Sequence, residues 1–122
     1  MEILPFEPGD LEQLDGLQPT DWAPIRPHYE YYLAQSMCHP FKAVQDGLLV
    51  GVSNASVFGS SAWLSHVIVR PDCRGQGIGG ALVGFLLALV DRQAVRTTSL
   101  IATDFGYPVY LKHGFAEEVR YV

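Results

Sequence analysis

A cluster of glycine and polar residues between positions 74 and 80 could bind a phosphate group. It reads Arg74-Gly75-Gln76-Gly77-Ile78-Gly79-Gly80 and separates an apolar run, residues 63–69, from a long apolar segment that starts at Ile78. Glycines let the backbone approach a ligand and turn its N–H groups toward one point, and a helix starting at Ile78 would aim its positive end there. The pattern therefore predicts a strand, a phosphate-binding loop and a helix in succession.

Two known glycine patterns fit this cluster incompletely. Gly75-x-Gly77-x-x-Gly80 has the spacing of the dinucleotide-binding fingerprint, but that motif needs its glycines directly after the strand, and residues 70–74 intervene here. The loop that binds nucleoside triphosphates requires Lys-Ser or Lys-Thr after its last glycine, and neither follows. A dinucleotide site, and a turn that only lets the helix pack on a sheet, stay open as alternatives.

Two titratable side chains near the loop could transfer protons. His66 is the only titratable residue in the strand expected at 62–69, and an imidazole titrates near neutral pH. Strand alternation puts it on the face opposite Val67 and Val69, where it could equally be a buried core residue. Tyr110 stands one turn into an expected helix, and its hydroxyl could donate a proton or its ring could simply pack.

The elements that would position these residues follow from periodicity and turn residues. The helix expected at 28–37 carries aromatic residues at the spacing of a core-facing stripe. A role for His28 or Tyr31 in facing a substrate stays open as an alternative. Asp46-Gly47 indicates a hairpin. Strand 62–69, the helix from Ile78 and strand 97–102 should form one parallel βαβ crossover. The other expected elements are an edge strand at 3–6, helices at 10–17, 28–37 (ended by His39-Pro40) and 107–113 (ended by Gly114), and strands from 41, at 48–58 and at 115–122.

The composition is that of one globular domain. The 122 residues suffice for a hydrophobic core. A net charge of −5 without a Lys/Arg cluster argues against nucleic acid or an anionic membrane as the main partner and favours a basic acceptor such as an amine. Cys38 and Cys73 lack metal-ligand spacing, so we expect no metal and a reducing, cytoplasmic setting. The N-terminus is unlike a signal peptide, and the longest apolar run, 78–90, is too short to span a bilayer.

Two motifs, in this order along the chain, resemble the signatures of the GNAT acetyltransferase superfamily. Arg74-x-x-Gly77-x-Gly79, after a hydrophobic strand ending in Val-x-Pro, resembles its acyl-CoA-binding motif. The segment from Tyr110 to Gly114-Phe115 resembles the second signature, an aromatic residue followed by three residues and Gly-Phe. The resemblance covers almost the whole chain. It implies an α/β fold: a mixed sheet of antiparallel N-terminal strands and one parallel βαβ crossover, flanked by about four helices.

The resemblance implies transfer of an acetyl group from acetyl-CoA, or another acyl group from its CoA ester, to the primary amine of a small molecule or amino-acid-like acceptor by direct attack. The pantetheine arm would run beside Val67, Ile68 and Val69, and the pyrophosphate would sit on the amides of Arg74 to Gly80. Tyr110 would stand near the sulfur and protonate or hydrogen-bond the thiolate. Thr103 takes a position where the family often has an Asn that contacts pantetheine. As general base, His66 and a bound water are alternatives, because the 62–69 strand has no carboxylate.

The C-terminal end departs from the family pattern. Family members usually have two strands after Gly-Phe, and residues 115–122 leave room for one. Its unpaired edge would be covered by a second copy, as a homodimer, or by a second domain. We therefore interpret residues 1–122 as a single acyl-CoA-binding domain lacking the last family strand, either the N-terminal module of a two-domain protein or a minimal version. A non-catalytic acyl-CoA-binding or regulatory module of a larger protein is the alternative function.

Overall fold

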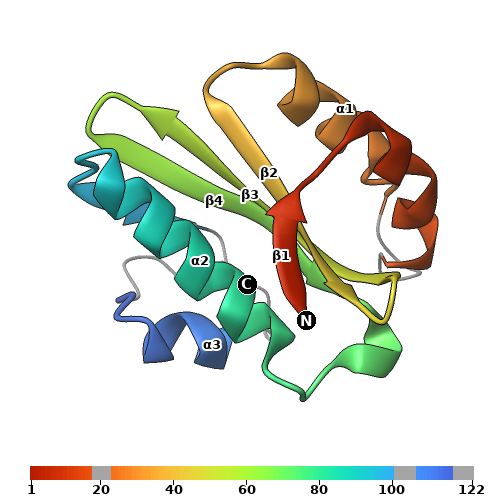
Figure 1. The fold of residues 1–122 in the computed structure, drawn as a ribbon. Coiled ribbons are helices and arrows are strands. Elements are labelled where there is room, and N and C mark those ends of the chain that lie inside the picture. The colour runs from red at the N-terminus through yellow and green to blue at the C-terminus, as the bar shows by residue number, and fades with distance from the viewer. Residues whose placement is uncertain (18–22, 101–106, 117–122) are drawn as a thin grey trace.

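The computed structural model describes residues 1–17, 23–100 and 107–116, which form a mixed sheet with helices on both faces (Figure 1). The predicted α/β architecture, with antiparallel N-terminal strands and one parallel crossover, is confirmed. The elements in chain order are β1 (Glu2–Pro5), η1 (Pro8–Gly16), α1 (Arg26–Ala34), β2 (Cys38–Gln45), β3 (Leu48–Phe58), β4 (Ser61–Val69), η2 (Pro71–Cys73), α2 (Ile78–Arg92), β5 (Thr97–Ser99) and α3 (Tyr107–Lys112).

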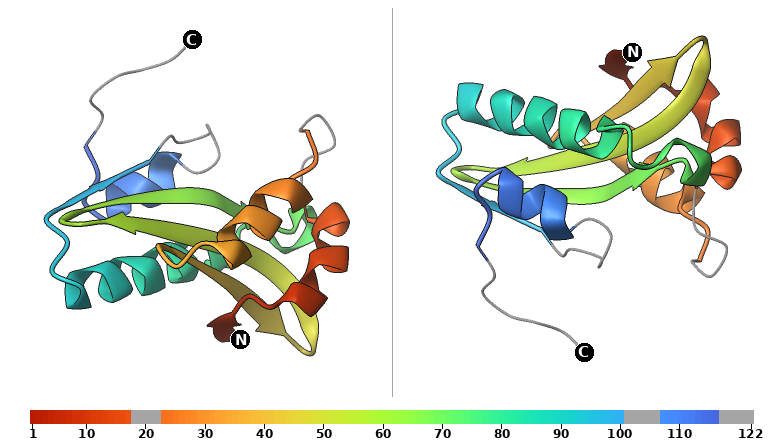
Figure 2. Two further views of the ribbon diagram at one scale, coloured as in Figure 1. Left: turned by 90° about the horizontal axis from the view of Figure 1, so that it is seen from above. Right: turned by 90° about the horizontal axis from the view of Figure 1, so that it is seen from below.

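The five strands lie in the sheet in the order of the chain, β1-β2-β3-β4-β5. Strands β1 to β4 are antiparallel to their neighbours, and β5 runs parallel to β4 after the crossover through α2. Helix α1 covers one face of the sheet and α2 covers the other (Figure 2). The carboxyl end of β4 leads through η2 and the glycine loop to the N-terminus of α2, the succession that the glycine pattern predicted.

The Asp46-Gly47 hairpin is confirmed between β2 and β3. Both turn residues have positive φ, +53° for Asp46 and +77° for Gly47. Two successive residues with positive φ give a turn whose twist matches that of antiparallel strands, and Asp and Gly are the residues that adopt it readily. The turn sets the starting register of β3 against β2, and β3 in turn pairs with β4, which carries the predicted site residues.

The predicted end of the second helix at His39-Pro40 is wrong, because α1 stops at Ala34 and both residues lie in β2. Proline is tolerated there because Pro40 lies just beyond the residues of β2 that pair with β1. Its carbonyl accepts a hydrogen bond from Phe6 N–H (3.0 Å), so its missing N–H falls on the β1 side and leaves the ladder with β3 intact.

Three further expectations differ in extent or cannot be assessed. The first helix is a 3-10 helix, η1, whose start is fixed by Asp10: its carboxylate accepts Glu7 N–H (2.8 Å) and pairs with Lys42 of β2 (2.7 Å). Strand β5 is described over Thr97–Ser99, and residues 101–102 of the expected strand 97–102 lie outside the described residues. The last strand, 115–122, falls mostly outside the described residues, so its covering by a homodimer or second domain stays a prediction.

Helix α2 is buried on more than one side, as its apolar sequence indicated. One face, formed by Val83, Leu86 and Val90, packs on Ala55, Ala62 and Leu64 of the sheet. A second side meets α3, because a Cβ added at Gly84 would lie only 3.5 Å from the His113 ring. Figure 1 shows α3 beside the N-terminal half of α2. No helix within the described ranges is long and apolar enough to cross a membrane.

Gly51→Ala is expected to destabilise the fold by about 1–3 kcal/mol, the usual cost of overpacking. A Cβ at Gly51 of β3 would lie 3.0 Å from Leu82 Cδ1 and 3.2 Å from the Ile68 carbonyl oxygen, so the Leu82 side chain and the β4 backbone would have to shift by a few tenths of an ångström. Urea denaturation measures the effect. Gly9→Ala is the matched control because a Cβ there meets no heavy atom within 4 Å. Equal stability of the two variants would contradict this close packing.

Candidate functional site

The glycine loop leaves an open space before the first turn of α2. Gly75 and Gly77 have φ of +78° and +82°, and a Cβ at either position would meet no heavy atom within 4 Å. Gly77 is the N-cap of α2 and accepts Ala81 N–H at 3.0 Å. The other N–H groups of the first turn have no partner within the helix. The left-handed backbone at Gly77 and the N-terminus of the 15-residue helix α2 thus direct N–H donors toward the open space beside the loop.

The predicted glycines serve two different purposes. Gly75 and Gly77 allow the backbone of the loop, whereas Gly79 and Gly80 lie inside α2 at close packing contacts. A Cβ at Gly79 would touch Val69 of β4 at 3.5 Å, and one at Gly80 would lie 3.7 Å from the ring of His113, which directly follows α3. Arg74 and Gln76 have exposed side chains, and Ile78 is buried in the core. Gly79 and Gly80 are therefore explained by helix packing. Gly75 and Gly77 are explained by the backbone conformation of the loop.

In the part of the chain that the structure describes, no strand pairs with the outer edge of β4 over its second half, which we call its open edge. β5 pairs with β4 only from Ser61 to Trp63 in the described part of the chain, and β4 continues alone to Val69. Arg70 N–H bonds the Val50 carbonyl oxygen of β3 at 2.8 Å. Because backbone groups alternate in direction along a strand, those of Val67 and Val69 point away from β3, toward the open edge. An extended ligand could pair with these groups beside the glycine loop.

A β-bulge interrupts β4 at His66. Val52 pairs with Ile68 and Asn54 pairs with Ser65, so that His66 and Val67 together oppose the single residue Ser53. His66 has a φ of +48°, which costs energy in a residue other than glycine and is often found at functional sites. The bulge lies beyond the residues of β4 that pair with both β3 and β5, in the part that, among the described residues, pairs with β3 alone.

Helix α1 holds His66 on the face of the sheet opposite Val67 and Val69, as strand alternation predicted. The His66 Nδ1 atom lies 2.5 Å from the Tyr32 hydroxyl, and its carbonyl oxygen accepts the Tyr29 hydroxyl proton at 2.9 Å. The His28 ring stacks on the imidazole with centroids 4.4 Å apart. Burial, and then the charge of His28, lower the pKa of His66 below its usual value. The imidazole is therefore neutral at pH 7 and can accept a proton.

Tyr110 lies on the other side of the open edge. It is buried in the hydrophobic cluster of the α2 face that also contains Leu64 and contacts Val67. Burial raises the pKa of its hydroxyl to about 12, and within the described residues no group hydrogen-bonds to it. The hydroxyl therefore stays protonated at neutral pH and can donate a hydrogen bond. His66 and Tyr110 thus approach the β4 edge from opposite faces of the sheet.

This geometry agrees with the comparison with known protein families. The model of the acetyltransferase (GNAT) domain matches residues 21–120. The chain belongs to the GNAT acetyltransferase family. As a GNAT domain, it is an acyl-CoA-dependent N-acyltransferase. Membership of the family does not define its acceptor. A sequence search of the curated proteins gave no match.

Solved structures share the GNAT fold at low sequence identity. A predicted acetyltransferase from Clostridium acetobutylicum, solved with acetyl-CoA, is 16% identical with a TM-score of 0.77 over 99% of this chain and 93% of that one. The ribosomal-protein-S18-alanine N-acetyltransferase of Escherichia coli is 22% identical (TM-score 0.82; 97% and 79%). Glucosamine-6-phosphate N-acetyltransferase of Arabidopsis thaliana is 15% identical (TM-score 0.77; 99% and 95%). The acceptors named for the last two proteins differ, so the fold alone does not identify an acceptor.

Sequence reasoning missed part of the site of this GNAT domain and one predicted residue cannot be placed. Thr103 lies outside the described residues. Tyr32 is buried in the core, as expected of the aromatics in this helix, but its hydroxyl also reaches His66 and Ser65, which the sequence did not indicate. The available signal was a set of polar residues at core positions of adjacent strands, Asn54, Ser56 and Ser65, which required a polar partner from the helix above them.

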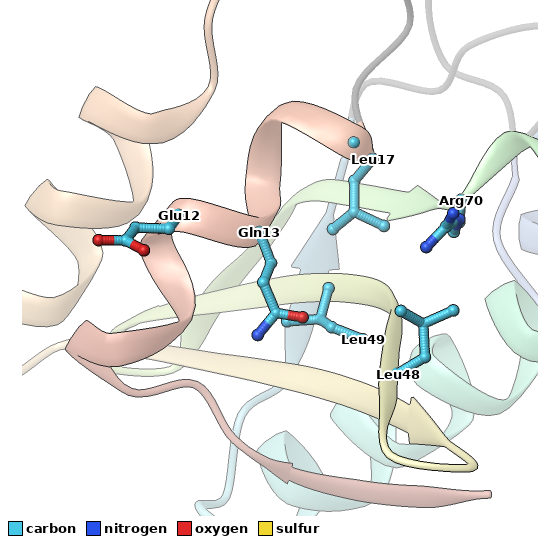
Figure 3. A pocket seen from close by; sticks show the side chains of 7 residues that line it. Glu12, Gln13, Leu17, Leu48, Leu49 and Arg70 are labelled. Atoms are coloured by element: carbon cyan, nitrogen blue, oxygen red, sulfur yellow. The ribbon is translucent and has the colours of Figure 1, made fainter.

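A cavity of about 230 Å³ also lies beside η1 (Figure 3), and it contains none of the predicted site residues. The Glu12 side chain and Arg70 stand at opposite ends of the hollow (Figure 3), and Arg70 already bonds Asp72 at 2.9 Å. No convergent set of polar groups therefore faces a ligand there. Its lining consists of Glu12, Gln13, Gly16, Leu17, Leu48, Leu49 and Arg70.

Proposed function

We propose that this GNAT domain transfers an acetyl group from acetyl-CoA to the primary amine of a small molecule or amino-acid-like acceptor by direct attack. The observation that carries the proposal is the open, bulged edge of β4, which leads straight into the glycine loop. The pyrophosphate would bind the amides of residues 74–80 at the N-terminus of α2, and pantetheine would pair with the free backbone groups of Val67 and Val69 beside Ile68. Thr103 stays a proposed pantetheine contact.

The residues around the edge suit each proton movement of the reaction. The amine nitrogen attacks the thioester carbon, a C–N bond forms and the C–S bond breaks. His66, neutral at pH 7, takes the proton that the amine loses. Tyr110, protonated at pH 7, donates a hydrogen bond or a proton to the departing thiolate. Backbone N–H groups freed near the bulge would stabilise the negative charge that develops on the carbonyl oxygen.

The setting of the reaction is also a proposal. Both cysteines are free, with Cys38 buried, which suits the reducing cytoplasm. The net charge of −5 favours a cationic amine over nucleic acid as partner.

A thiol-release assay with acetyl-CoA and a panel of amines tests the proposal. We expect CoA to form only when a suitable amine is present and in a 1:1 ratio with the N-acetylated product, measured by mass spectrometry. Tight binding of acetyl-CoA without turnover across amino acids, polyamines, amino sugars and peptide N-termini would overturn it and favour the non-catalytic module.

A further inference from the structure

A chain of hydrogen bonds connects His66 to the interior of the protein through Tyr32. The Tyr32 hydroxyl lies 2.5 Å from His66 Nδ1 and 2.9 Å from the Ser65 hydroxyl. Ser65 in turn accepts a hydrogen bond from Asn54 Nδ2 at 3.1 Å. The second proton of the Asn54 amide goes to Ser56, at 3.0 Å. The chain is therefore fixed at its buried end, and His66 is its outer end.

We propose that Tyr32 is a positioning residue that accepts the Nδ1 proton of His66 and so leaves Nε2 free to take a proton from the acceptor amine. This inference rests on the proposed acetyltransferase function. A neutral imidazole carries one proton, and the nitrogen without it is the base. A partner at Nδ1 thus decides which nitrogen faces the substrate and fixes the plane of the ring.

A hydroxyl suits this position because it can accept from His66 in both protonation states. In the proposed arrangement Tyr32 accepts the Nδ1 proton and donates its own to Ser65, which has a second lone pair for the Asn54 amide. When Nε2 gains a proton, the imidazolium keeps the same acceptor. Burial raises the pKa of Tyr32, so its hydroxyl keeps its proton across the range in which His66 titrates.

The surroundings of His66 favour its neutral form, whereas a hydrogen bond from Nδ1 to Tyr32 would favour its protonated form. The titratable groups that the structure places against the imidazole are His28, Tyr29 and Tyr32, all from α1. Burial and His28 lower the pKa of His66. An acceptor at Nδ1 stabilises the imidazolium, so its removal should lower the pKa further. The acid limb of the rate profile, where the base becomes protonated, should then move to lower pH.

Tyr32→Phe tests the role because it removes only the hydroxyl. We expect kcat/KM to fall roughly 10- to 100-fold and the acid limb to shift down by about one pH unit, from the loss of a hydrogen bond to a charged group. His66→Gln should remove that limb and cost roughly 10²- to 10⁴-fold. Ser61→Ala is the control, since it removes an exposed hydroxyl at the start of β4 and should leave both quantities unchanged. If Tyr32→Phe unfolds, Ser65→Ala should give a smaller shift in the same direction.

Nitrogen NMR of the His66 ring decides the contact without any substrate. The expected result is an Nδ1–H tautomer in the parent protein and a lower His66 pKa in Tyr32→Phe. An Nε2–H tautomer, or an acid limb and His66 pKa that do not move, would overturn the proposal and leave Tyr32 a packing residue. An Nδ1–H tautomer without turnover on any amine would instead refute the acetyltransferase assignment, so the two failures are distinguishable.

Discussion

Gly77→Leu is expected to weaken acetyl-CoA binding by about 100-fold or more. Gly77 caps α2 with a φ of +82° and has open space where its side chain would be, so leucine would occupy the volume proposed for the pyrophosphate. A hydrogen bond to a charged group contributes about 1.5–3 kcal/mol, and loss of even two such bonds corresponds to a 100-fold change or more. Calorimetry with acetyl-CoA measures the loss directly.

Gly59→Leu separates this effect from backbone strain. Gly59 lies in the turn between β3 and β4, has a φ of +59° and also has no heavy atom near its absent Cβ. Both variants therefore carry the cost of a leucine in the left-handed region, about 1–2 kcal/mol. Only Gly77→Leu should lose binding. Unchanged affinity in Gly77→Leu would refute the site at the loop, and equal losses in both variants would mean that strain is the cause.

Tyr110→Phe is expected to lower turnover by roughly 10²- to 10⁴-fold, the range for loss of general acid catalysis, with little change in CoA affinity. The substitution removes one oxygen and keeps the ring that packs 5.9 Å from Phe115, centroid to centroid. Because the pKa of the hydroxyl is about 12, no loss of activity from its deprotonation should appear at neutral or mildly alkaline pH. Steady-state kinetics over that range check both points.

A packing role for Tyr110 predicts the reverse pattern. Tyr110→Phe would then turn over normally, and Tyr110→Ala would lose stability because it empties a place in the cluster with Val83 and Leu86. Ser61→Ala controls for loss of a hydroxyl elsewhere, since Ser61 is exposed. Turnover of Tyr110→Phe within about twofold of the parent would rule out the acid and leave protonation of the thiolate to solvent.

Local sequence signals predicted much of the fold because they act over a few residues. Asp46-Gly47 specifies a turn by its own backbone preferences, and the hairpin has the expected boundaries. Gly77 and the apolar segment after it marked the start of α2 at Ile78. Pro in the first turn and Gly114, with a φ of +89°, bracket α3. These local features are enough to predict the positions of the loop, of the strand before it and of Tyr110 in the chain of elements.

The features that the sequence did not reveal depend on contacts between distant segments. Pro40 was interpreted as the end of a helix, yet it lies in β2, because its lost donor falls outside the ladder with β3. The bulge at His66 and Val67 is set by the pairing of β4 with β3 around Ser53, which the local sequence of β4 does not encode. Tyr32 meets Ser65 and His66 from 33 and 34 residues away. A helical stripe of tyrosines cannot show which hydroxyl finds a polar partner.

Amide chemical shifts on titration with acetyl-CoA test the location of the site most directly. The largest changes should fall on Val67, Val69 and the loop from Gly75 to Gly80, which surround the open edge of β4 and the N-terminus of α2. The amides of Gln13 and Leu49, beside the separate cavity, should change little. Changes concentrated at that cavity, with the loop and the β4 edge unaffected, would contradict the proposed acyl-CoA site.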